Sequence, residues 1–80
     1  MRIKVKPFAM ARAIVGQTEL QIDLPEGATV KDAFEFILER FPKLAQLKSV
    51  RFSVNLEYSE PTTKLQDGDE LALIPPVSGG

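Results

Sequence analysis

The sequence of 80 residues contains no cysteine, no histidine and no tryptophan. Without cysteine there is no disulfide and no thiolate nucleophile, and without histidine there is no imidazole base. Transition-metal sites lose their usual ligands as well, so no metal site is predicted. Neither phosphate-binding glycine motif, GxGxxG or GxxxxGKS/T, occurs in the chain. These absences argue against an enzyme of this size that works without a partner.

An excess of charge of either sign and a long apolar run are also lacking. Ten Lys and Arg oppose eleven Asp and Glu, and the formal net charge is −1. Nucleic acids and anionic membranes attract clustered positive charge, so neither is predicted as a partner. The longest mostly apolar run, residues 8–15, contains Arg12 and is far shorter than the roughly 20 residues of a membrane span. With no secretory signal pattern, a cytoplasmic protein is expected.

The length and composition predict one small globular domain. Apolar residues make up 44% of the chain and charged residues 26%, as in soluble folded proteins. Eighty residues leave no room for a second hydrophobic core. We expect a domain over residues 1–75 and an extended tail over residues 76–80.

Alternation of apolar and polar residues predicts half-buried strands in three places. The first begins near Ile3 and runs to about Phe8, the second covers residues 20–24, and the third covers residues 50–54. A short strand is predicted to begin near Tyr58. The continuous apolar run at residues 71–74 indicates a strand buried on both faces.

The strongest helix signal follows Thr29, whose hydroxyl can cap the first free amides while Asp32 completes an arrangement close to a capping box. Pro42 ends this helix. Shorter helical turns are predicted for residues 9–15, stopped by Gly16, and for residues 43–48. One apolar stripe runs along the main helix and contains Val30, Ala33, Phe34, Ile37, Leu38 and Phe41.

The predicted order is strand, strand, helix, strand, short strand, strand. An early hairpin, one crossover helix and a late central strand build a mixed sheet whose first and last strands are parallel at its middle. This is the α+β architecture called beta-grasp, or ubiquitin-like. Helices on both faces of the sheet would contradict it.

The C-terminal residues have a composition suited to threading. Gly79 and Gly80 have no side chains, so their backbone can pass through a narrow channel. Pro75 and Pro76 favour an extended conformation. Six residues beyond Ile74 span roughly 20 Å, which is enough for the terminal carboxylate to enter another protein's active site. An idle tail is the alternative.

A free α-carboxylate is ionised at neutral pH and is a poor electrophile. It must be activated before it can transfer a group, and adenylation by ATP is the common route. Because this chain has no nucleotide-binding loop, a partner enzyme must use the ATP. The chain is then a carrier that binds no cofactor itself.

The sequence resembles the MoaD family, the small subunit of molybdopterin synthase, over nearly its whole length. The final Pro-Pro-Val-Ser-Gly-Gly is the most specific part of the resemblance. The matching segments are Ile3-Lys4-Val5, Phe8-Ala9-Met10-Ala11-Arg12 with Gly16, residues 24–30, Phe52-Ser53-Val54-Asn55, Asp67-Gly68-Asp69-Glu70 and residues 73–80.

The resemblance implies a sulfur carrier in molybdenum cofactor biosynthesis. In this family a MoeB-like enzyme adenylates the terminal glycine, and sulfur transfer then gives a thiocarboxylate. The charged carrier docks on a MoaE-like large subunit, which supplies the catalytic groups, and a heterotetramer with that subunit is expected. Sulfur passes to cyclic pyranopterin monophosphate.

The resemblance also implies roles for individual residues. Gly80 carries the sulfur, and Gly79, Ser78 and Val77 form the part of the tail that threads into the partner. Leu56 departs from the family pattern, because many relatives have glycine or a polar residue after the asparagine. The expected partner interface consists of Ile74, Pro75, Pro76 and Phe8.

Other interpretations remain open at the level of sequence. The chain can be a carrier for thiamine, a tungsten pterin or another sulfur pathway, a modifier joined to lysines, or an interaction module with an idle tail. Phe8 and Phe36 are incidental aromatics unless one of them joins Ile74 in an exposed patch. Tyr58 is interpreted as a strand residue. The acidic group Asp67, Asp69 and Glu70 indicates a turn more strongly than a cation site.

Overall fold

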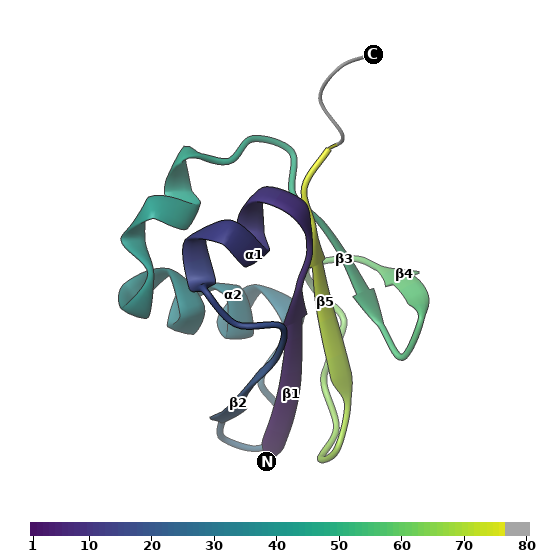
Figure 1. The fold of residues 1–80 in the computed structure, drawn as a ribbon. Coiled ribbons are helices and arrows are strands. Elements are labelled where there is room, and N and C mark those ends of the chain that lie inside the picture. The colour runs from purple at the N-terminus through teal and green to yellow at the C-terminus, as the bar shows by residue number, and fades with distance from the viewer. Residues whose placement is uncertain (77–80) are drawn as a thin grey trace.

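The computed structural model describes residues 1–76 of the chain. A five-stranded sheet has the order β2-β1-β5-β3-β4, and the helices lie together on one side of it (Figure 1). The strands are β1 (Arg2–Pro7), β2 (Leu20–Asp23), β3 (Arg51–Val54), β4 (Glu57–Ser59) and β5 (Glu70–Ile74). The helices are α1 (Ala9–Val15), α2 (Val30–Arg40) and the 3₁₀ helix η1 (Pro42–Gln46).

The strand pairing confirms the predicted beta-grasp topology. Strands β1 and β5 are parallel at the centre, with Val5 opposite Leu71. Strand β2 pairs antiparallel with β1, while β3 pairs antiparallel with both β5 and β4. The last strand is therefore inserted between the first strand and the third.

The sheet has one covered face and one open face, because successive side chains of a strand point to opposite sides. On β1, Ile3 and Val5 are fully buried beneath the helices, while Lys4 and Lys6 between them are half-buried on the open face. From α2, Val30, Ala33 and Ile37 join the same core. Burying one such aliphatic side chain stabilises the fold by about 1.5–3 kcal/mol.

Helix α2 begins with the predicted cap. The Thr29 hydroxyl oxygen accepts a hydrogen bond from the Asp32 amide at 3.2 Å, and the Asp32 carboxylate accepts one from the Thr29 amide at 2.9 Å. These reciprocal bonds form a capping box. The α-helix ends at Arg40, before Pro42, and its apolar stripe faces the sheet as predicted.

Several boundaries differ from the sequence prediction: β2 ends at Asp23 rather than at residue 24, β3 begins at Arg51 rather than at residue 50, and β5 begins at Glu70 rather than at residue 71. Strand β1 ends at Pro7 rather than at Phe8, although the Phe8 amide still donates to the Leu73 carbonyl at 3.0 Å. The turn predicted for residues 43–48 is a 3₁₀ helix over Pro42–Gln46, which accommodates proline at its first position. Helix α1 has its predicted bounds, and Gly16 at φ 78° ends it in the left-handed conformation that glycine tolerates. No helix within residues 1–76 is long and apolar enough to cross a membrane.

Candidate functional site

The tail begins at the end of the central strand of the sheet, β5. Leu73 lies opposite Pro7 of β1, and Ile74 lies opposite Arg51 of β3, so β5 is paired on both sides up to Leu73 and on the β3 side up to its last residue. Leu71 and Leu73 are fully buried, as predicted for this apolar run. The base of the tail is therefore fixed in position and direction relative to the sheet.

The structure separates the two prolines that follow β5. Pro75 is buried, whereas Pro76 is exposed, so Pro76 is the proline accessible to a partner. The predicted carrier Gly80 and the predicted threading residues Gly79, Ser78 and Val77 lie outside the described residues. Their roles stay predictions.

The open face of the sheet carries an apolar groove next to the end of β5. Phe8 and Ile74 both line it, so Phe8, and not Phe36, is the aromatic residue that joins Ile74 in one apolar patch. The groove has a volume of about 250 Å³. Its lining residues are Phe8, Ser53, Leu56, Tyr58, Glu70, Ala72 and Ile74.

The depth of the groove follows from the side chains on two adjacent strands. Ser53 of β3 lies directly opposite Ala72 of β5, and both side chains are small and buried. Ile74, two residues along β5, lies on the same face of the sheet as Ala72. Small residues thus form the floor, while Phe8 and Tyr58, which are 39% and 72% exposed, form part of the rim.

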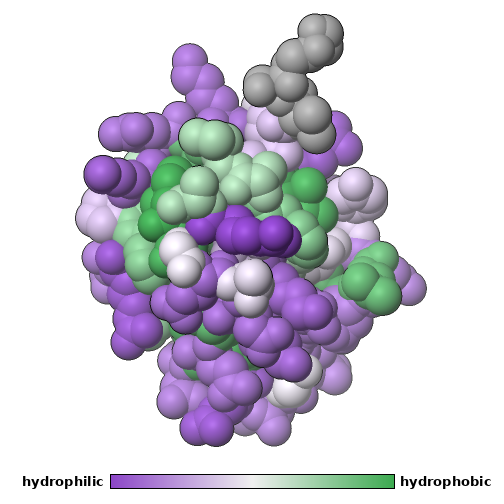
Figure 2. Space-filling view, viewed as in Figure 1, coloured by the Kyte–Doolittle hydropathy of each residue, from purple (hydrophilic) through white to green (hydrophobic). Residues whose placement is uncertain are grey.

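Leu56 and Tyr58 are groove residues that sequence reasoning did not assign to the interface. Leu56 is 90% exposed in the two-residue turn between β3 and β4, and Figure 2 shows an isolated apolar group at the tip of this hairpin. Its departure from the family pattern was the available signal. Tyr58 carried no signal beyond its strand, because the groove forms only when β3, β4 and β5 are assembled.

The hairpin is tied to β5 by Asn55. The Asn55 side-chain carbonyl accepts from the Glu70 amide at 3.0 Å, and its amide nitrogen donates to the Asp69 carboxylate at 2.9 Å. The Asn55 backbone amide also donates to the Glu70 carbonyl at 2.9 Å. These bonds hold the turn that carries Leu56 against the start of the strand that carries Ile74.

Phe36 and the acidic group have structural surroundings of their own. Phe36 lines a different hollow beside Leu24 and Pro25, and the Arg40 guanidinium carbon lies 5.2 Å from the centre of its ring. Asp67 accepts from the Arg2 amide at 2.7 Å, and Asp69 accepts from the Gln66 amide at 2.8 Å, as expected for a turn. Residues 1–76 hold no grouping of three potential metal ligands.

Comparison with known proteins agrees with this geometry. Residues 5–80 match the ThiS family. The whole chain is 42% identical over 83 residues to the complete molybdopterin synthase sulfur carrier subunit of Chlamydomonas reinhardtii. It is 38% identical over 81 residues to the Arabidopsis thaliana protein of the same name, covering all of this chain and 84% of that relative.

Two solved structures have the same ubiquitin-like fold. The small archaeal modifier protein SAMP1 of Haloferax volcanii superposes over the full length of both chains with a TM-score of 0.91 and 29% identity. A Pyrococcus furiosus protein assigned as molybdopterin converting factor, subunit 1, gives a TM-score of 0.87 with 36% identity over 95% of this chain and 98% of that one. The chain belongs to the ThiS family of ubiquitin-like beta-grasp proteins. Within that family its relatives include molybdopterin synthase sulfur carrier subunits, which confirms the resemblance to MoaD.

Proposed function

We propose that this chain is the sulfur carrier subunit of a molybdopterin synthase and that it holds sulfur as a thiocarboxylate on Gly80. The observation that carries the proposal is the attachment of the Gly79-Gly80 end to β5, a strand paired with β1 up to Leu73 and with β3 up to Ile74. A domain that fixes the base of a short glycine-ended segment can dock outside an active site while the end reaches inside. The full-length identity to sulfur carrier subunits supports the same role.

The proposed charging step begins at the Gly80 carboxylate. A carboxylate oxygen attacks the α-phosphorus of ATP, which gives an acyl-adenylate and releases pyrophosphate. Sulfur at the oxidation level of sulfide then attacks the acyl carbon, forms the carbon–sulfur bond and expels AMP. Because the described residues contain no cysteine, histidine or phosphate-binding loop, a MoeB-like activating enzyme supplies the groups for both steps and uses the ATP.

The proposed delivery step takes place on a MoaE-like large subunit, which holds the catalytic groups. There the sulfur passes to cyclic pyranopterin monophosphate, and a water oxygen restores the Gly80 carboxylate. A Helicobacter pylori protein with this fold, subunit 1 of the molybdopterin-converting factor, is found in complex with subunit 2, which supports a large-subunit partner. A heterotetramer in the cytoplasm is the proposed assembly.

The groove offers the surface by which the domain docks. Phe8, Tyr58, Leu56 and Ile74 give it an apolar rim next to the base of the tail. Exposed apolar side chains gathered in this way are typical of protein interfaces, where aromatic residues contribute most of the binding energy. Pro76, two residues after Ile74, is exposed as well, whereas Pro75 is buried.

Reconstitution with the activating enzyme tests the proposal. The purified chain, its activating enzyme, ATP and a sulfide donor are incubated, and the intact mass is measured. We expect a gain equal to the mass difference between sulfur and oxygen. The variant that lacks Gly80 should gain nothing and keep its melting temperature, since the deletion removes none of the core residues, the last of which is Leu73. An unchanged mass with an enzyme active on another carrier would overturn the proposal.

A protein-modifier function is the second candidate, because SAMP1 of Haloferax volcanii superposes on this chain with a TM-score of 0.91. Modification and sulfur transfer share the acyl-adenylate and diverge afterwards. A modifier ends in an isopeptide bond to a lysine amine, whereas a carrier ends in a thiocarboxylate. Digestion of cell protein and a search for lysines that carry the Gly79-Gly80 remnant distinguishes the two.

A further inference from the structure

The charged side chains of this molecule are unevenly distributed. Within residues 1–76, the ion pairs all use cations of β1, which lie close to carboxylates on neighbouring elements. The distances are 3.4 Å for Arg2–Asp23, 3.9 Å for Lys4–Glu19 and 3.0 Å for Lys6–Glu70. The positive charges of β1 are thus balanced locally.

The segments around the end of β5 carry positive charge without acids. Residues 7–18 and 41–56 contain Arg12, Lys43, Lys48 and Arg51 and no aspartate or glutamate. The other six cations and all eleven acids lie elsewhere in the chain. In a chain with a net charge of −1, these two segments together carry a charge of +4, and the tail begins near them. Glu60, which lines a hollow together with Arg51, is an acid beside this group.

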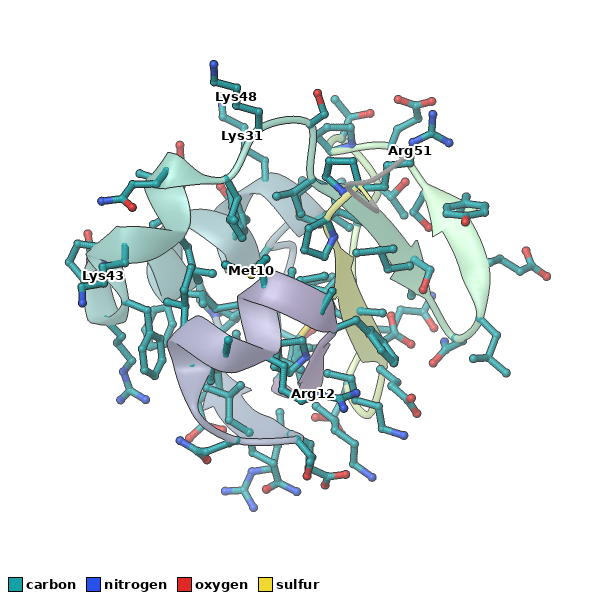
Figure 3. All side chains as sticks on the ribbon, turned by 45° about the horizontal axis from the view of Figure 1, so that its top comes forward. Met10, Arg12, Lys31, Lys43, Lys48 and Arg51 are labelled. Carbon is teal, nitrogen blue, oxygen red and sulfur yellow. The ribbon has the colours of Figure 1, made fainter. Side chains whose placement is uncertain are left out.

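Three of these cations form what we call the collar: Arg12, Lys48 and Arg51. Arg51 lies opposite Ile74 in the β3–β5 pair. The Arg12 Nε donates to the Pro7 carbonyl at 3.3 Å, and its guanidinium carbon lies 5.4 Å from the centre of the Phe8 ring. Figure 3 shows Arg12 on α1, with Lys48 and Arg51 on separate sides of the β5 end.

The backbone keeps the collar in place. The Pro7 carbonyl accepts the hydrogen bond from Arg12, and Pro7 lies opposite Leu73. The Arg12 side chain is therefore positioned relative to the last residues of β5. Ser49 has φ 57°, an unusual value for a residue other than glycine, in the short bend between Lys48 and Arg51. The collar is thus carried by three different segments that meet at the base of the tail.

From this placement we infer that the collar docks against acidic side chains around the entrance of the channel in the activating enzyme that receives the tail. The inference rests on the proposed function and adds the chemistry of one partner surface. Gly80 lies four residues beyond Pro76, about 13 Å when extended. The collar therefore meets the rim of the channel and not the nucleotide at its bottom.

A protein rim fits the collar better than a polyanion does. Three cations on a chain of net charge −1 give a weak electrostatic attraction to nucleic acid or to an anionic bilayer. The chain also continues beyond the end of β5, on separate sides of which Lys48 and Arg51 lie (Figure 3), so an opposing surface needs an opening there. A channel surrounded by carboxylates provides both features.

The activating enzyme, which binds ATP, is a better partner for the collar than the large synthase subunit, which binds a pterin phosphate. The reason is the charge that each substrate requires of its site. A site for a pterin phosphate needs positive charge from the protein, which would repel the collar, whereas the phosphates of ATP are partly neutralised by a bound cation. ATP arrives with Mg²⁺, whose protein ligands are carboxylates. Complementary charge at the rim mainly raises the association rate constant, which suits a carrier that must leave after each charging event.

Association kinetics with the activating enzyme test the inference. We expect Lys48→Glu and Arg51→Glu each to lower the association rate constant about threefold to tenfold at low ionic strength. At roughly 0.3 M salt the difference from the unaltered chain should fall below about twofold, because screening shortens the range of the interaction. Lys64→Glu makes the same charge change within the acidic segment of residues 57–70 and should stay within about twofold at both ionic strengths.

The outcomes distinguish this inference from the proposed function. If the unaltered chain is adenylated while the collar variants associate at the same rate as Lys64→Glu, the collar inference is wrong and the carrier function stands. A loss that persists unchanged at high salt also overturns it. If the unaltered chain is never adenylated by an active enzyme, the proposed function fails first. Equal melting temperatures of all variants exclude misfolding as the cause.

Discussion

At the scale of single residues, Leu56 occupies a position that suits glycine better than leucine. Asn55 and Leu56 have φ values of 51° and 72°, the positive values that both central residues of a type I′ turn adopt. Asparagine tolerates this conformation, whereas an aliphatic residue there costs about 1 kcal/mol. The 90% exposed side chain gains little packing in return within this chain.

We therefore expect Leu56→Gly to stabilise the isolated protein by about 0.5 kcal/mol, since release of the strain exceeds the entropy that glycine adds to the unfolded chain. Urea unfolding of both proteins measures the difference. Leu56→Ala keeps the positive φ and serves as the control, with little or no gain expected. A Leu56→Gly variant less stable than Leu56→Ala would contradict the strain account.

The residue scale also shows where sequence reasoning reaches its limit. Ile74 and Phe8 were predicted to lie at the interface, and they do share one groove. Pro75 was assigned to the same surface, but its side chain is buried, because burial at the end of a strand depends on which neighbours cover it. Pattern and spacing carry no information about such coverage.

At the scale of elements, α2 depends on its capping box for a defined start. Thr29→Ala removes the hydroxyl that accepts from the Asp32 amide, and we expect a loss of about 1 kcal/mol of unfolding free energy. Thermal or urea unfolding measures it. Thr62, an exposed loop residue, provides the matched control: Thr62→Ala should change stability by less than about 0.5 kcal/mol. Equal effects at both positions would contradict a specific role of the cap.

The elements with strong local signals could be predicted from the sequence. Three signals depend only on residues close together in the sequence. They are the stripe and cap of α2, the alternation in β1 and the apolar run of β5. Boundaries such as Pro7 could not be predicted, because its place at the end of β1 depends on pairing with Leu73, a distant residue. Likewise, the 3₁₀ geometry of η1 reflects its packing on the core through Leu44.

At the scale of the whole molecule, the proposed function makes the groove and the tail one docking unit with two separable parts. We expect Ile74→Asp to weaken binding to the large subunit at least about tenfold, because a carboxylate replaces an apolar side chain at the groove. Calorimetric titration measures the dissociation constant. Met10→Ser removes an exposed apolar side chain of α1 outside the groove and is the control. Similar affinities for both variants would place the interface elsewhere.

The assembled molecule also explains why the groove escaped prediction. Its rim comes from β4, β5, the turn between β3 and β4 and the residue after β1, and its floor is the pair of small residues Ser53 and Ala72. These positions become neighbours only through the strand order β2-β1-β5-β3-β4. The tail chemistry needed no such assembly, because it depends on consecutive residues.

The most direct measurement of the central claim is tandem mass spectrometry of the C-terminal peptide from the chain isolated out of its own cells. A chain that carries sulfur should yield a fraction of this peptide with one oxygen replaced by sulfur, and fragmentation should place the sulfur on Gly80. A C-terminal peptide found solely as the free carboxylate or as an amide to lysine, under conditions that preserve thiocarboxylates, would contradict the account.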